Sequence, residues 1–277
     1  MDLWRTIKTA GWLGWQIEAN WAEPFTFIAY AITRPIFSTL ILVLMYKVVA
    51  GGQTSTALFA YIYLGNAFFM YTANVLAGVG IVIHEDRERY EMLKYIYLAP
   101  IVTYFYMLGR CIPKLAITTL AVLVTVVMGV WIFDLKLAFG HWPLMILSFP
   151  LGIIATIALG IALASLTLLT ARHGFFMTEG TAGVFYLVSG AVFPIEVLPN
   201  WLEPVSLAFP ITYWLEGLRR GMMAEPVSKV FAGWSDEKLL LILTVTTVLS
   251  VVLSVLINRG IEYIARKQGK LDQVFNY

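Results

Sequence analysis

The sequence predicts an all-α membrane protein with six transmembrane helices. Of its 277 residues, 60% are hydrophobic and 13% are charged, whereas soluble domains carry roughly a quarter charged residues. Crossing the apolar core of a bilayer takes about 20 apolar residues per helix. The apolar stretches are continuous rather than alternating, which favours helices over the strands of a membrane β-barrel. We expect one transmembrane domain over 1–277, with spans near 25–49, 57–83, 104–133, 143–170, 175–193 and 238–258.

The first 24 residues precede spans one to five (25–193) and are rich in tryptophan. Tryptophan prefers the headgroup level of a bilayer, and this segment contains Trp4, Trp12, Trp15 and Trp21. The pattern predicts a helix over 1–24 that lies along the membrane surface. An unstructured tail is the alternative.

The distribution of basic residues predicts the orientation of the spans, because cytoplasmic loops are enriched in Lys and Arg. With the N-terminus inside, the inside segments hold Arg5, Lys8, Arg87, Arg89, Lys94, Arg172, Arg259, Arg266, Lys267 and Lys270. The outside segments then hold Lys136, Arg219, Arg220 and Lys229. We therefore expect a multi-pass protein whose N- and C-termini are both cytoplasmic.

The segment between spans two and three is densely charged. Its acidic and basic residues are Glu85, Asp86, Arg87, Glu88, Arg89, Glu91 and Lys94. On a helix, Arg87, Glu91 and Lys94 form one solvated ladder, while Tyr90, Leu93 and Tyr97 form a stripe on another face. The pattern predicts a cytoplasmic amphipathic helix over 85–99 that docks into a groove on another protein. A solvated connector is the alternative.

The segment 194–237 is too apolar for an ordinary loop but is divided by prolines. Its pieces of about a dozen residues cannot cross a core of about 30 Å. We expect an external re-entrant hairpin with helices near 198–209 and 211–223, followed by span six and a cytoplasmic tail over 238–277. Its candidate gate residues are Trp201, Pro210, Trp214, Glu216 and Arg219, with Glu216 facing Arg219 and Arg220. A rigid plug without a transport role is the alternative.

Polar residues inside the predicted spans are candidates for a transport pathway, since they usually face a cavity or a partner. Asn66 and Asn74 lie eight residues apart on nearly one helix face, either as links between helices or as substrate contacts. Glu179 either lines the inner mouth or pairs with Arg172. Three cations near the cytoplasmic span ends either snorkel to the interface, which we favour, or face a cavity or a partner: Arg34, Arg110 and Lys114.

Several classes of function find no support in the sequence. The net charge of +2 argues against a nucleic-acid partner. Cys111 is the one cysteine, and we expect it to be an inert buried thiol without a redox role. The histidines fall in separate loops, so no metal site is expected. The sequence also shows no set of a nucleophile, a base and a residue that orients the base, so no catalytic site is expected. The sequence also lacks the glycine-rich loop of a P-loop ATPase.

Four features together resemble one family: a tryptophan-rich surface helix, a proline early in span one, a charged helix that ends in Leu-x-Pro, and a closing series of Phe-Pro, Leu-Pro and Leu-Arg pairs. The corresponding residues are Arg34-Pro35, Leu98-Ala99-Pro100, Phe193-Pro194, Leu198-Pro199, Phe209-Pro210 and Leu218-Arg219. Over nearly the whole chain this pattern resembles an ABC-2 type transport permease. The closing pairs are most similar to the antibiotic-exporter and nodulation-factor-exporter branches.

The resemblance implies a permease of the prokaryotic plasma (inner) membrane that pairs with a second copy or a paralogue. It implies a separate ABC ATP-binding subunit, which carries ATP and Mg and contacts the helix at 85–99. This chain itself is then expected to have no cofactor and no catalytic residue. Members export drugs, lipids, lipo-oligosaccharides or polysaccharides. We therefore expect an ATP-driven exporter subunit that moves an amphipathic, lipid-linked or glycan substrate outward, with membrane lipid as a further partner.

Two rival functions are weaker. A secondary transporter without an ATPase partner predicts inverted repeats and a carboxylate at the midplane, for which Glu179 alone is thin support. A membrane enzyme acting on lipids needs His, Asp or Glu clustered at one face, and no such cluster is apparent in the sequence.

Overall fold

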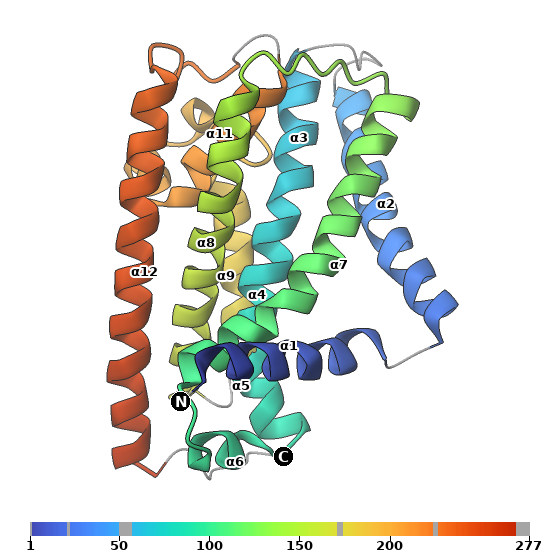
Figure 1. Cartoon of the computed structure of the whole chain (residues 1–277). Coiled ribbons are helices and arrows are strands. Elements are labelled where there is room, and N and C mark those ends of the chain that lie inside the picture. The colour runs from blue at the N-terminus through green and yellow to red at the C-terminus, as the bar shows by residue number, and fades with distance from the viewer. Residues whose placement is uncertain (1, 21–22, 50–56, 171–173, 224–226, 270–277) are drawn as a thin grey trace.

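The computed structural model describes residues 2–20, 23–49, 57–170, 174–223 and 227–269, and every regular element within them is helical. Figure 1 shows a bundle of long helices with a shorter helix, α1, lying across one end. Within these described ranges, five helical stretches are long and apolar enough to cross a membrane. They are α2 (Pro24–Val49), α3 through η2 (Ala57–Arg89), α7 (Thr103–Ile132), α8 (Trp142–Thr167) and α12 (Asp236–Lys267).

The predicted fifth span at 175–193 is shorter than expected. Its helix, α9, runs from Gly174 to Val188, so that its 15 residues extend only about 22 Å at about 1.5 Å per residue. The helix stops because Gly190 adopts a φ of 73°, a left-handed conformation that glycine adopts readily and that commonly ends helices. The sequence alone did not reveal this stop, since 189–193 is as apolar as the helix before it.

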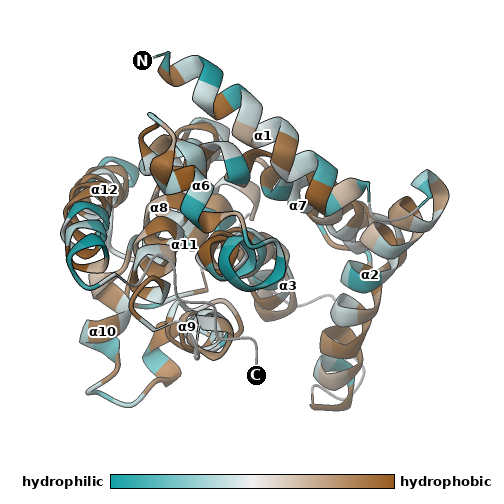
Figure 2. Ribbon diagram, turned by 90° about the horizontal axis from the view of Figure 1, so that it is seen from below, coloured by the Kyte–Doolittle hydropathy of each residue, from teal (hydrophilic) through white to brown (hydrophobic). Residues whose placement is uncertain are grey.

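The second span occupies the middle of the bundle. Seen along the bundle in Figure 2, α3 is surrounded by α7, α8, α9 and α11. This span is built from α3 (Ala57–Tyr71), a π-helical turn η1 (Thr72–Leu76), α4 (Ala77–Gly80), α5 (Val82–His84) and a second π-helical turn η2 (Glu85–Arg89). π-helical turns are rare and frequently mark functional positions. One of them contains Asn74 and the other contains the first charged residues of the predicted docking segment.

Helix α1 (Leu3–Ala19) confirms the predicted N-terminal helix and packs across α7. Its contact face is made of the small residues Ala10, Gly11 and Gly14, all of them buried. On α7, Gly109 faces them so closely that an added Cβ would lie 2.6 Å from both the Cβ of Ala10 and the backbone oxygen of Ile7. Small residues therefore set the close approach of these crossed helices, and Trp4, Trp12 and Trp15 remain exposed.

The predicted single helix over 85–99 is broken in the structure. Turn η2 continues the second span to Arg89, Glu91 adopts a φ of 51°, and a separate six-residue helix, α6 (Leu93–Leu98), follows. Because Glu91 lies at this break, with Arg87 before it and Lys94 after it, the three residues do not form the predicted ladder. Figure 1 places α6 at the same end of the bundle as α1, which we call the α6 end.

The segment after α9 folds into short helices at the opposite end, the α11 end (Figure 1). These are the 3-10 turn η4 (Ile195–Val197), α10 (Glu203–Ala208) and α11 (Pro210–Met222). Two short helices are thus present near the predicted positions. Helix α11 packs closely on α8, since a Cβ at Gly152 would lie 2.0 Å from the indole of Trp214.

Candidate functional site

Part of the predicted docking segment is buried inside this chain. Asp86 is 0% exposed and Arg87 is 2% exposed, so neither side chain presents a surface to another protein in this conformation. Glu85 and Glu88 are half-buried. The sequence-based interpretation of all seven charged residues as one solvated partner surface is therefore wrong for Asp86 and Arg87, because the segment continues the central span instead of leaving it.

Asp86 is the centre of a buried polar cluster. One of its carboxylate oxygens accepts a hydrogen bond from Nη1 of Arg110 at 2.8 Å, and the other accepts from the Tyr106 hydroxyl at 2.8 Å. Arg110 also reaches Glu85, with 3.6 Å between Nη2 and Oε2. A buried charge is tolerated only when it is paired and hydrogen-bonded, so this cluster fixes the base of the central span against α7.

Two further contacts extend this cluster to other helices. The Nη2 of Arg87 donates to the backbone oxygen of Leu168 at 2.9 Å, just after α8. Lys114 of α7 forms an ion pair with Glu18 of α1. Arg110 and Lys114 therefore follow the less favoured of the two interpretations, because each is buried against a carboxylate supplied by another element instead of snorkelling.

The exposed part of the segment lies on and just before α6. Arg89, Glu91 and Lys94 are exposed, and so are two large side chains of α6, Tyr95 (63%) and Leu98 (81%). On the other face of α6, Tyr97 is buried, its ring lies 5.5 Å from the guanidinium of Arg266 in α12, and burial raises the pKa of its hydroxyl. Helix α6 thus has one face anchored to the bundle and one face open.

All three predicted pathway residues line one cavity of about 690 Å³. Asn66 and Asn74 come from the central span and Glu179 comes from α9, while α2 and α7 supply further walls that include Arg34 and Lys114. Asn66 accepts a hydrogen bond from the hydroxyl of Tyr186, also of α9, at 2.9 Å. For Arg34 the sequence favoured snorkelling over a cavity, because the residue lies near a span end, and the structure places it in the cavity lining.

The predicted gate residues do not line that cavity. Pro210, Trp214, Glu216 and Arg219 are buried in α11, and Trp201 lies apart from them with 72% of its surface exposed. Arg219 donates to three backbone oxygens, those of Tyr61 (3.0 Å), Gly190 (2.8 Å) and Ala191 (2.9 Å). This guanidinium therefore ties α11 to both α3 and the end of α9, which is the role of an anchor.

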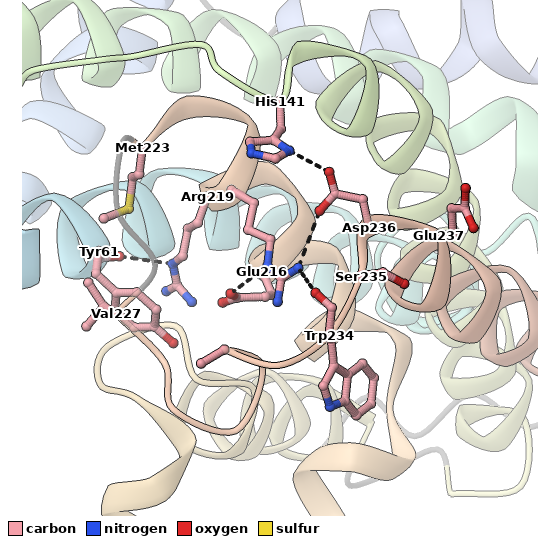
Figure 3. Close-up of a pocket in the computed structure, with 12 residues that line it drawn as sticks. Tyr61, His141, Glu216, Arg219, Met223, Val227, Trp234, Ser235, Asp236 and Glu237 are labelled. Atoms are coloured by element: carbon pink, nitrogen blue, oxygen red, sulfur yellow. Dashed lines mark hydrogen bonds and ion pairs between the residues drawn. The ribbon is translucent and has the colours of Figure 1, made fainter.

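A second cavity, of about 600 Å³, lies at the α11 end and is drawn in Figure 3. Glu216 pairs here with Arg220, at 3.4 Å, and makes no ion pair with Arg219. Burial raises the pKa of the Glu216 carboxyl. Arg220 also donates to the backbone oxygen of Trp234 at 2.7 Å and reaches Asp236, which in turn contacts His141 at 2.5 Å. These contacts connect α11 to the start of α12 and to the residue before α8.

Comparison with known proteins agrees with this architecture. The family model for the ABC-2 type transporter matches residues 11–223. The "Probable multidrug ABC transporter permease YbhR" of Escherichia coli K12 is 23% identical over 178 residues, which cover 64% of this chain and 46% of that protein. "Nodulation protein J" of Rhizobium leguminosarum bv. viciae is 27% identical over 108 residues, which cover 37% of this chain and 40% of that protein. The matched regions thus span less than half of each relative.

The family model covers most of the chain, from α1 through α11. It includes the central span, the buried cluster around Asp86, the exposed face of α6 and the lining of the cavity with Asn66, whereas the second cavity extends past residue 223. The chain is a multi-pass membrane protein and belongs to the ABC-2 type transporter family.

Proposed function

We propose that this chain is the membrane-spanning subunit of an ATP-driven ABC exporter. It works with a separate ABC ATP-binding subunit, which holds ATP and Mg, and with a second permease copy or a paralogue. The substrate is amphipathic, lipid-linked or a glycan, and it moves out of the cytoplasm or the inner leaflet. The family supports the transport role, and the name of one relative, a probable multidrug ABC transporter permease, supports an ABC transporter with a small-molecule substrate.

The observation that carries the proposal is the two-faced α6. Its exposed face presents Lys94, Tyr95 and Leu98, a mixture of charge and large apolar surface that fits a groove on a soluble partner. Arg89 and Glu91 lie exposed beside it. This surface replaces the full set of seven charged residues as the proposed contact with the ATP-binding subunit.

The buried cluster transmits movement of α6 to the helices that span the membrane. When the ATP-binding subunits close, they displace α6, and η2 moves with it because only three residues separate the two elements. The Asp86–Arg110 pair then moves α7, and the Arg87 contact with Leu168 moves the end of α8. The helices around the cavity with Asn66, Asn74 and Glu179 shift together, and the substrate passes outward. In this proposal both termini are cytoplasmic and the α11 end is external.

The test is a double substitution on the exposed face of α6. Tyr95→Ala with Leu98→Ala is expected to weaken binding of the ATP-binding subunit at least tenfold and to lower complex-dependent ATP turnover by a similar factor. The matched control is Tyr263→Ala, since this tyrosine of α12 is equally exposed (68%) and lies off α6. If the double variant binds the ATP-binding subunit and turns over ATP as fully as the control, α6 is not the contact.

A further inference from the structure

Arg34 of α2 and Glu179 of α9 are two side chains of opposite charge in the lining of the larger cavity. Both are exposed, and neither makes an ion pair or hydrogen bond, with each other or with a further residue of the described part of the chain. Arg172, the partner that the sequence offered for Glu179, lies outside the described residues. The other charged residues of the cavity, Glu18 and Lys114, are paired with each other. The cavity therefore holds one cation and one anion that the described residues do not neutralise.

Both side chains belong to the helix stripes that face the cavity. On α2, Tyr30, Arg34 and Ser38 line it and recur at helical spacing. On α9, Glu179 and Tyr186 line it two helical turns apart, and so from one helix face. Figure 2 shows α9 and α2 on either side of α3. The two charges thus reach the cavity from different walls.

The rest of the site suits an amphiphilic molecule. Its volume of about 690 Å³ is within the range of about 300–1,000 Å³ that is typical of small-molecule sites. Asn66 and Asn74 add amide groups from the central span. The two helices that supply the charges also expose large apolar side chains, Phe37 and Ile41 on α2 and Phe176 on α9. A hydrocarbon chain can lie along this apolar surface while a polar headgroup occupies the cavity.

A ligand that satisfies this site carries both signs of charge. An unpaired ionisable side chain is costly within a membrane and normally faces a cavity or an ionic partner. The guanidinium of Arg34 suits a phosphate or a carboxylate, to which it donates two parallel hydrogen bonds. The carboxylate of Glu179 accepts hydrogen bonds from an ammonium group. A wholly anionic or wholly cationic ligand leaves one of the two side chains without a counter-charge, and a neutral ligand leaves both.

We propose that the larger cavity binds a zwitterionic amphiphile. Its anionic group contacts Arg34, its cationic group contacts Glu179, and its hydrocarbon chain lies along the exposed apolar faces of α2 and α9. The inference rests on the proposed function and specifies the charge pattern of the substrate. Arg34 and Glu179 then determine specificity, so that loss of either one changes which ligand charge is preferred.

Binding of matched probes tests the charge pattern. The purified complex with its ATP-binding subunit, in an uncharged detergent, is titrated with lysophosphatidylethanolamine, and bound molecules are counted by native mass spectrometry. We expect this zwitterion to bind at least about tenfold more tightly than lysophosphatidylglycerol or an alkyltrimethylammonium ion of the same chain length, because each of these lacks one ionic contact. Equal binding of the three amphiphiles would overturn the proposed charge pattern.

A headgroup without a hydrocarbon chain tests whether the ligand is an amphiphile. Glycerophosphoethanolamine has the same two charges as the lysolipid, and we expect it to bind at least about tenfold more weakly because it buries no apolar chain. If it binds as tightly as the lysolipid, the site recognises a soluble zwitterion and the amphiphile is wrong.

Two single substitutions test the role assigned to each charge. Arg34→Gln is expected to weaken binding of the zwitterion and of the anionic lysolipid by at least about tenfold and to leave binding of the cation unchanged. Glu179→Gln is expected to weaken binding of the zwitterion and of the cation and to leave the anionic lysolipid unchanged. Arg5→Gln and Asp134→Asn are the controls, expected to bind all three probes as before, since both residues are exposed and line neither cavity. Equal loss of all three probes, or no change in either variant, would overturn the assignment.

The outcomes also separate this inference from the proposed function. A complex that retains its ATP-binding subunit and its ATP turnover but shows no preference for the zwitterion would overturn the inference and leave the exporter role standing. A chain that prefers the zwitterion but carries no ATP-binding subunit and turns over no ATP would contradict the proposed function and leave the ligand site standing.

Discussion

Asp86 and Arg110 form the most consequential buried pair at the α6 end. Both side chains are almost fully buried, and the aspartate accepts hydrogen bonds from Arg110 and from Tyr106. Asp86→Ala removes the nearest carboxylate from Arg110 and leaves only Glu85, at 3.6 Å, to compensate the buried charge, for which we expect a loss of about 3–5 kcal/mol of stability. Thermal unfolding of the purified protein measures this loss, and Glu91→Ala, an exposed carboxylate of the same segment, is the control with little expected effect.

Removal of both partners distinguishes pairing from packing. Asp86→Ala combined with Arg110→Met also removes the buried arginine that has lost its nearest carboxylate, so the double variant is expected to be more stable than Asp86→Ala alone. If the two substitutions instead added their losses, the ion pair would not be the source of the stability. A double variant that loses ATP-dependent transport but keeps its stability would indicate that the pair transmits movement from α6 to α7.

Gly65 provides a second prediction at the level of one residue. A Cβ at this position would lie 1.8 Å from Nη2 of Arg219 and 2.1 Å from the backbone oxygen of Ala191. Gly65→Ala therefore forces Arg219 away from the carbonyls that it holds and is expected to lower stability by about 1–3 kcal/mol or more. Thermal unfolding again gives the readout. Gly183→Ala, where nothing lies within 4 Å of the new methyl, is expected not to lower the unfolding temperature, since alanine also favours the helix.

At the level of elements, α1 depends on the glycine contact with α7. Gly109→Val places a branched side chain where a single Cβ already meets Ala10 and Ile7 at 2.6 Å. We expect α1 to separate from α7 while the long helices persist, so that its backbone amides lose protection against hydrogen exchange. Unchanged protection of α1 in this variant would show that other contacts hold it. Gly260→Ala on α12 is a suitable control because its surroundings are open.

The success of the sequence prediction differs from element to element. The long apolar stretches predicted α2, the central span, α7, α8 and α12 well, because span length is a property of local composition. The end of α9 depended on the backbone of Gly190 and on Arg219, a residue distant in sequence that takes the carbonyls of 190 and 191. The amphipathic pattern of α11 was visible, yet its burial follows from the fit of Trp214 against Gly152.

The candidate site, too, was predicted from the sequence only in part. Polarity within the spans singled out Asn66, Asn74 and Glu179, and the structure brings all three to one cavity, although their place in a transport pathway stays a prediction. Charge in a connecting segment, however, normally indicates exposure to solvent, and this reasoning failed for Asp86 and Arg87. Their partners, Arg110 and the backbone of Leu168, are supplied by α7 and by the residue after α8. Only the folded bundle brings these groups together.

At the scale of the whole molecule, the account depends on one claim, that this chain is driven by a separate ATP-binding chain. The most direct measurement is native mass spectrometry after mild detergent extraction of the chain expressed with its genomic neighbours, together with an ATPase assay. We expect a complex of two permeases and two ATP-binding chains that hydrolyses ATP. A folded chain that stays alone and shows no nucleotide turnover would contradict the account and favour a transporter that works without an ATPase.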